Sequence, residues 1–230
     1  MANQVEKVNA IAIADIEKIN NLTDDNMEKI SGLEFTGVTD AMTLIETRTE
    51  SDVTSITFDS GISSTYDMFI FEVINAHSHG SEGTQQNLQF AVNATDTADY
   101  DDIYINAGLH YSYHDEDDAT PSGYVDGSSL DGARNTSQHA GYVNLTSYEG
   151  NVASESSSGR LIIWGLGSGS YVKNFVSEFS TNARHDSAMF YEARGSIGNN
   201  DVTAIDDVNF KYKAGGNISA TIHLWGMAKS

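Results

Sequence analysis

The sequence has no cysteine and 1 proline among 230 residues. Without cysteine the chain has neither disulfides nor thiolate ligands for a metal ion. Because proline is so scarce, turns must be made by glycine, of which there are 20, and by Asn, Asp and Ser. A chain of this length buries a core that is stable without covalent cross-links, so a folded domain is still expected.

Basic residues are scarce as well. The chain has 12 Lys and Arg against 33 Asp and Glu, which gives a formal net charge of −21. Binding to nucleic acid or to anionic membranes needs a basic surface, so neither is expected. The stretch between Arg48 and Arg134 holds no Lys or Arg. This composition favours a solvated acidic surface and a saline setting, in which salt screens the repulsion between like charges.

Long apolar segments are also missing. No run approaches the roughly 18 residues of a membrane-spanning helix. The opening residues MANQVEKVNA do not lead from a basic flank into an apolar stretch, as a secretory signal does. We therefore expect no membrane insertion and no secretion signal. Virion proteins leave the cell by lysis without a signal, and a cytosolic protein fits the same facts.

The first 37 residues contain an 11-residue repeat with the pattern apolar-Glu-Lys-apolar-Asn/Ser-small-apolar. Its apolar positions are Val5, Val8, Ile11, Ile16, Ile19, Leu22, Met27, Ile30 and Leu33. Apolar residues three apart share one face of a helix. Asn20-Asn21 and Ser31-Gly32 resemble helix C-caps, and Thr23 or Asp24 resembles an N-cap. The pattern predicts short helical turns separated by caps.

Single turns of this kind are unstable alone, so their apolar stripe must be buried against something else. We expect residues 1–37 to be an anchoring or oligomerisation segment. The alternative is a helical hairpin folded back on the rest of the chain.

From residue 38 to 230 the apolar period changes to two, which indicates β-strands. The expected strands are 53–58, 66–74, 88–93, 103–105, 142–145, 160–164, 171–179, 188–191, 205–212 and 218–225. No helical pattern separates them, so the prediction is an all-β fold, an antiparallel jelly-roll-like β-sandwich. Trp164 and Trp225 end two of these strands, which favours core or interface packing over an exposed sugar platform.

The sequence predicts long loops broken by short strands from Thr95 to Gly141, a stretch rich in Asp, Gly, Ser, Tyr and His. Loops on a rigid sandwich are frequent binding sites. The candidates for contact with a ligand such as a glycan are Tyr100, Tyr104, Tyr111, Tyr113 and Tyr124.

Recognisable catalytic motifs are missing: there is no P-loop, G-x-G-x-x-G, H-E-x-x-H or G-x-S-x-G. A Ser/His/Asp triad has no local signature, although its residue types are present. Weak Ca²⁺ candidates are Asp115, Asp117 and Asp118, but they lack EF-hand spacing, and a solvated loop without a cofactor is expected. His77, His79, His110 and His114 are interpreted as ordinary surface or interface histidines rather than metal ligands.

The repeat resembles a segment of tailed-phage structural proteins, especially those of marine phages, in which units such as I-x-K-I-N-G-L precede a β-rich domain. The matching residues are Ile16–Leu22 and Met27–Phe35, with Asn21 where the pattern usually has Gly. The stretch Ala214–Gly226 is similar to the last hairpin of such proteins. The resemblance implies a virion component and carries no catalytic residues.

The expected function is therefore a phage structural protein: a tail fibre, head fibre or capsid decoration on the surface of the particle. Its expected partners are capsid or tail proteins, two further copies in a homo-trimer, and a host-surface glycan. The alternatives are a lectin-like carbohydrate-binding module and, with less support, a polysaccharide depolymerase.

Overall fold

The structure is a computed structural model. It describes residues 42–80, 86–94, 100, 103, 105–114, 122–126, 141–147, 149–183, 187–198, 202–213 and 215–228, together with six short strands nearer the N-terminus. The chain divides into two compact units, residues 1–41 and 42–230. The sequence pattern placed this boundary after residue 37.

The described residues of the first unit form antiparallel strand pairs, not helical turns. Each repeat supplies one pair, whose two strands are separated by two residues in the sequence. The pairs are β1 (Lys7–Val8) with β2 (Ile11–Ala12), β3 (Lys18–Ile19) with β4 (Leu22–Thr23), and β5 (Lys29–Ile30) with β6 (Leu33–Glu34). The predicted helical turns are therefore wrong at these residues.

The spacing of the apolar residues accounts for the difference. Residues three apart share a helix face, but they also stand directly opposite each other across a two-residue hairpin turn. The structure takes the second arrangement, with Val8 opposite Ile11, Ile19 opposite Leu22, and Ile30 opposite Leu33. Asn20-Asn21 and Ser31-Gly32, which separate the paired strands in the sequence, are compatible by residue type with such hairpins, because Asn and Gly adopt positive φ readily.

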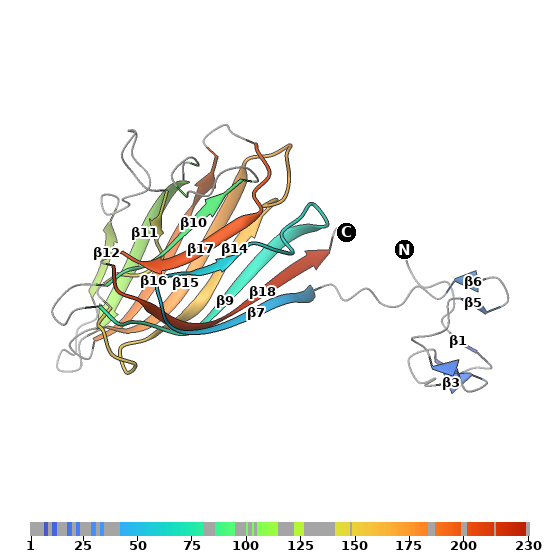
Figure 1. The fold of residues 1–230 in the computed structure, drawn as a ribbon, viewed down its shortest axis with the longest axis horizontal. Helices are drawn as coiled ribbons and strands as arrows, with labels where there is room; N and C mark the ends of the chain where they lie inside the picture. The colour runs from blue at the N-terminus through green and yellow to red at the C-terminus, as the bar shows by residue number, and fades with distance from the viewer. Residues whose placement is uncertain are drawn as a thin grey trace. The chain divides into compact units, whose positions relative to one another are not determined.

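The second unit is an antiparallel β-sandwich (Figure 1). Its strands are β7 (Met42–Val53), β8 (Ile56–Phe58), β9 (Tyr66–Ser78), β10 (Leu88–Asn93), β11 (Ile105–His114), β12 (Ser122–Asp126), β13 (Val143–Asn144), β14 (Ser157–Trp164), β15 (Lys173–Ala183), β16 (Ser187–Ile197), β17 (Asp207–Tyr212) and β18 (Ile218–Ala228). The large sheet has eight strands in the order β12-β11-β16-β15-β14-β9-β18-β7. The small sheet has four, in the order β13-β10-β17-β8. The predicted all-β antiparallel class is confirmed, and the jelly-roll form of its connections stays a prediction.

The core lies between the sheets because alternate residues of each strand point inward. On β9 the buried Phe69, Phe71 and Val73 alternate with more exposed neighbours. The ring of Phe71 lies 5.4 Å from that of Phe58 on β8 and 5.4 Å from that of Phe210 on β17, measured between centroids. These three rings join the two sheets.

Two parts of the large sheet were not predicted as strands. β7 carries charged and hydroxyl residues along most of its length, and its first eleven residues precede the expected strand start at Val53. β11 and β12 pair within the stretch predicted as long loops. In the part of the chain that the structure describes, no helix is long and apolar enough to cross a membrane.

Candidate functional site

The outer face of the large sheet, turned away from the core, carries the most unusual surface of the described residues. On β14, Leu161 and Ile163 are buried, whereas Arg160, Ile162 and Trp164 are at least partly exposed. The solvated face of an antiparallel sheet is normally polar. Here it carries large apolar side chains as well.

These side chains line up in two adjacent rows, because residues opposite one another on paired strands form rows across a sheet. The first row is Leu44, Trp225, Ile70, Ile162 and Val176, from β7 to β15. The second is Met42, Met227, Met68 and Trp164, from β7 to β14. We call these residues the apolar block. Its most exposed members are Leu44 at 47%, Met42 at 44% and Trp164 at 42%.

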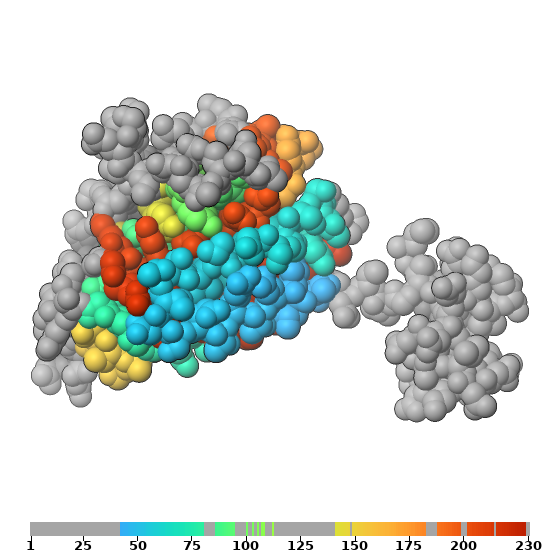
Figure 2. All heavy atoms as spheres, in the orientation of Figure 1, coloured from blue at the N-terminus to red at the C-terminus, as the bar shows by residue number. Residues whose placement is uncertain are grey.

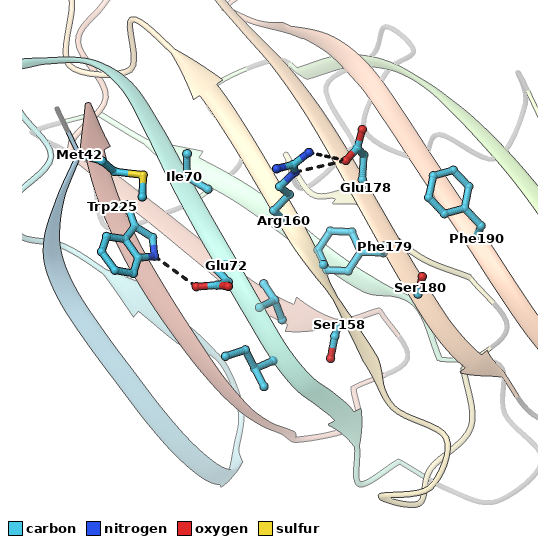
Figure 3. A pocket seen from close by; sticks show the side chains of 13 residues that line it. Met42, Ile70, Glu72, Ser158, Arg160, Glu178, Phe179, Ser180, Phe190 and Trp225 are labelled. Atoms are coloured by element: carbon cyan, nitrogen blue, oxygen red, sulfur yellow. Dashed lines mark hydrogen bonds and ion pairs between the residues drawn. The ribbon is translucent and has the colours of Figure 1, made fainter. Parts of the chain in front are cut away.

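A charged row borders the apolar block. By register its members are His223, Glu72, Arg160, Glu178 and Glu192. Arg160 donates from Nε and Nη2 to Glu178 Oε2, at 3.2 and 2.9 Å. Trp225 Nε1 donates to Glu72 Oε2 at 3.3 Å, so the charged row is hydrogen-bonded to the block itself (Figure 3).

A groove of about 860 Å³ lies where part of the block meets part of the charged row. Met42, Ile70 and Trp225 line it from the block, and Glu72, Arg160 and Glu178 line it from the row. Met42 and Trp225 stand on one side and Phe190 on the other, with Arg160 and Glu178 between them (Figure 3). This volume lies within the range of ligand pockets, roughly 300–1,000 Å³. The groove is suited to contact with another surface, because it offers apolar walls and charged groups that already have partners.

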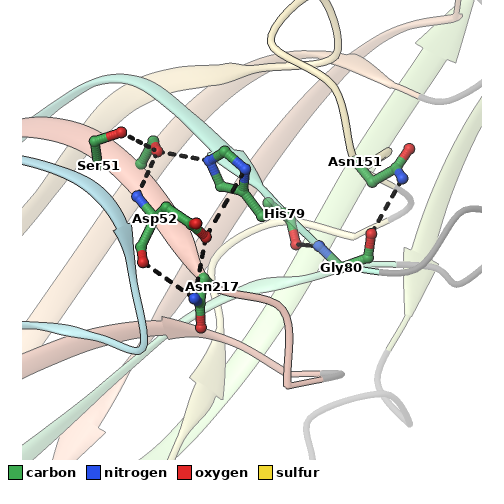
Figure 4. Close-up of polar contacts among 8 residues, drawn as sticks. Ser51, Asp52, His79, Gly80, Asn151 and Asn217 are labelled. Carbon is green, nitrogen blue, oxygen red and sulfur yellow. Dashed lines mark hydrogen bonds and ion pairs between the residues drawn. The ribbon is translucent and has the colours of Figure 1, made fainter.

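A second polar cluster joins the ends of β7, β9 and β18 (Figure 4). His79 Nε2 lies 2.7 Å from Ser219 Oγ, which accepts the backbone N–H of Asp52 at 2.9 Å. Asn217 Nδ2 donates to the backbone O and to Oδ1 of Asp52, both at 3.0 Å. These bonds hold Asp52 at φ 57°, a left-handed conformation that Asp tolerates better than most residues.

Ser219, His79 and Asp52 are the residue types of a hydrolytic triad, but their geometry is not that of one. In a triad the carboxylate orients the imidazole through a hydrogen bond, and the serine meets substrate. Here Asp52 Oδ1 lies 3.9 Å from His79 Nδ1, and Ser219 is only 7% exposed. The cluster is better explained as a tie between strand ends. That the chain is not an enzyme stays a prediction.

Removing this tie gives a measurable cost. Ser219→Ala leaves the Asp52 amide without its acceptor, so it is expected to lower the free energy of unfolding by about 1–2 kcal/mol. Denaturant unfolding measures the change. The control is Thr221→Ala, which removes an exposed hydroxyl pair with Thr49 and is expected to cost less than about 0.5 kcal/mol. Equal effects of the two variants would contradict a structural role for Ser219.

The carboxyl group of Glu149 lies inside the sandwich. Glu149 is fully buried and accepts hydrogen bonds from Ser157 Oγ of the large sheet and from Tyr212 OH of the small sheet, the latter at 2.5 Å. Burial raises the pKa of Glu149 to about 7, and hydrogen bonds from Ser157, Thr146 and Tyr212 partly oppose that rise. The carboxyl group therefore links the two sheets, and its full burial keeps it from meeting a ligand.

The tyrosines predicted to contact a ligand are not gathered into one site by the described residues. The Tyr100 ring packs 5.9 Å from that of Tyr142, and burial raises its pKa. Backbone pairing places Tyr111 and Tyr113 in β11 and Tyr124 in β12, in strands rather than in loops. Tyr104 lies outside the described residues.

The weak metal candidates Asp115, Asp117 and Asp118 also lie outside the described residues. His77 and His79 are neighbours, with ring centroids 5.1 Å apart, while His110 and His114 belong to β11. Within the described ranges, no three His, Cys, Asp or Glu side chains gather in a way that holds a metal ion. Val5, Ile16 and Met27 of the predicted anchor are likewise outside the description.

Sequence reasoning missed the apolar block, although a signal for it was present. The signal is the unbroken apolar run Leu161–Trp164, which is typical of a buried strand. In an antiparallel sheet such a run also places apolar residues on the outer face. The core reading of Trp164 is wrong, since this side chain is 42% exposed.

No protein-family model, curated protein or solved structure matches this chain. Its function has to follow from its own repeat, sheets and surfaces. The hairpin repeat and the apolar block call for an explanation, because neither is needed to complete the core of the sandwich.

Proposed function

We propose that this chain is a structural subunit of a virus particle, an outward-facing fibre or capsid decoration anchored by its N-terminal repeat. It is made in the host cytoplasm and ends on the surface of the virion. Its partners are capsid or tail proteins and further copies of itself, in a trimer. Jelly-roll connectivity, which is frequent in viral shell proteins, belongs to the same proposal.

The observation that carries the proposal is the recurrence of one hairpin at each repeat. Each pair is a separate two-stranded sheet with strands of two residues. An isolated two-stranded hairpin is marginally stable at best, so such units need a further surface to pack on. Equivalent units in series give several weak contacts that add up to a durable attachment. The resemblance of the same residues to tailed-phage proteins points to the kind of particle.

The sandwich suits the outward role. A net charge of −21 keeps copies soluble and apart once they are displayed on a surface. The proposal assigns no catalytic step to it, and the polar cluster around Ser219 ties strand ends instead. The sandwich thus serves as a stable body for display or host contact.

The test is incorporation into particles. Ile19→Asp combined with Ile30→Asp places charges at two paired apolar positions of the hairpins. Losing the burial of two such side chains is expected to reduce the amount of chain on purified particles roughly 100-fold or more. Quantitative mass spectrometry of particles grown on cells that supply the variant measures the amount.

The matched control is Asn20→Asp with Ser31→Asp, which adds the same charge at turn positions where Asp is tolerated. This variant is expected to be incorporated like the natural chain. Normal incorporation of the Ile19/Ile30 variant would contradict the anchoring role of the repeat. Absence of the natural chain from purified particles would contradict the proposal that it is a virion protein.

A further inference from the structure

We propose that the outer face of the large sheet, centred on the apolar block, is an interface between copies of this chain. Exposed apolar patches of this kind mark interaction sites in soluble proteins. Interfaces between identical copies are more apolar than other interfaces. The inference deepens the proposed function and rests on it in one respect, the tethering of copies by the repeat.

The charge of this face favours a second copy as the occupant. Two chains of net charge −21 repel each other over most approaches. On the outer face, however, Arg160 pairs with Glu178 at 2.9 Å, and Arg194 pairs with Glu192 at 2.7 Å. Glu72 belongs to the same border, so three carboxylates stand beside two guanidinium groups and the border carries a net charge of about −1. Copies of an acidic chain therefore meet here with less repulsion than across a face of unpaired carboxylates.

The hydrogen bonding of the face also suits burial under a protein surface. Covering a polar group costs free energy unless it keeps a partner. The indole N–H of Trp225 and the guanidinium of Arg160 already have acceptors in Glu72 and Glu178. A glycan site would instead present donors and acceptors that await a ligand. The face can be covered without leaving these donors unpaired.

The edge of the sheet is not an equally good place for association. β7 forms one edge of the large sheet, and it borders the sandwich in the space-filling view (Figure 2, blue). It carries Glu46, Arg48 and Glu50, and its pairing with β18 is irregular at two points. Charged and irregular edge strands resist pairing with another chain. Copies are therefore expected to associate through the face.

The position of the block in the sequence supports the same partner. Met42, its first member, is also the first residue of the second unit and follows the first unit, residues 1–41, in the sequence. If the repeat holds copies together, this short covalent link raises the local concentration of one face near another. A face that is weakly self-associating on its own is then sufficient.

The experiment is the solution mass of the full-length protein by light scattering over a range of concentrations. The natural chain is expected to show a multiple of its 24.9 kDa. Leu44→Glu with Trp164→Glu places two charges in the block, at side chains exposed enough for the fold to tolerate them. We expect this variant to dissociate at concentrations about 100-fold higher than the natural chain. Far-UV circular dichroism confirms that it is folded.

The matched control is Val152→Glu with Val202→Glu, which adds the same charge at exposed aliphatic side chains outside the block, 47% and 36% exposed. Its mass is expected to equal that of the natural chain. A second test uses the cysteine-free sequence: Leu44→Cys is expected to give cross-linked dimers with a short bis-maleimide, and Val152→Cys is not. Monomeric mass of the natural chain at all concentrations, or equal cross-linking of both cysteines, would overturn the interface.

The Ile19/Ile30 variant separates this inference from the proposed function. If its mass falls while that of the Leu44/Trp164 variant does not, the repeat assembles the chain and the face inference fails. If only the mass of the Leu44/Trp164 variant falls, the face is the interface and the repeat does not assemble the chain. Binding to a glycan array by a monomeric natural chain, abolished by Trp164→Glu, would assign the face to a sugar instead.

Discussion

Raising the pH from about 5 to about 8 is expected to remove about 2–3 kcal/mol of stability through one residue, Glu149. Its carboxyl group is buried between the sheets, where burial raises its pKa from 4.5 to about 7. In that pH interval the folded chain holds a proton on this group that the unfolded chain has released. The free energy of unfolding therefore falls as the pH rises from 4.5 toward 7, and above that this contribution is lost.

The comparison of the natural chain with Glu149→Gln isolates this effect from the other carboxyl groups. Glutamine keeps one of the two acceptor oxygens that Ser157 and Tyr212 use, and it does not titrate, so the free energy of unfolding of this variant lacks this component of the pH dependence. Denaturant unfolding gives the free energy of unfolding of both chains at about pH 5 and about pH 8. The difference between the two chains is expected to change by about 2–3 kcal/mol between these pH values. If this difference stayed constant with pH, the pKa of Glu149 would not be raised in the folded chain.

Most strands of the sandwich follow from local sequence. Leu88–Asn93 and Ile218–Trp225 are rich in residues that favour strands, and turn residues flank them. β7 was missed because it is an edge strand, whose polar residues lower both its apolar content and the alternation that reveals inner strands. β11 and β12 were missed because Gly, Ser and His weaken the same signal.

The conformation of the repeat could not be predicted from its sequence, for a different reason. Its period and its apolar positions were read correctly, but a spacing of three residues is common to a helix face and to a two-residue hairpin. Asn20-Asn21 suits a helix end and a hairpin turn alike, so the sequence alone allowed either conformation.

The candidate site could not be assembled from sequence, because its parts are distant along the chain. Trp225 and Glu72 are 153 residues apart, and His79 and Ser219 are 140 apart. Sheet order brings them together, and that order depends on long-range pairing. What the sequence did contain was the apolar character of both faces of β9 and β14.

Neighbouring residues on β9 provide the sharpest test of that two-faced character. Phe71 is fully buried and contacts Phe58 and Phe210 across the sandwich. Phe71→Ala is expected to lower the free energy of unfolding by about 3–5 kcal/mol, which lowers the melting temperature by roughly 10 °C for a chain of this size. Thermal and denaturant unfolding measure both quantities. A loss below about 1.5 kcal/mol would mean that the rings do not join the sheets as described.

Ile70, one position earlier, faces the other way and belongs to the apolar block. Ile70→Ala is expected to cost about 1 kcal/mol or less in the isolated chain, because its side chain is only partly buried there. Its larger effect is expected in the self-association measured by light scattering. Phe71→Ala should show the reverse, a large loss of stability with association unchanged wherever the variant is folded. If both substitutions acted only on stability, the outer face would have no partner and its apolar rows would serve the sheet alone.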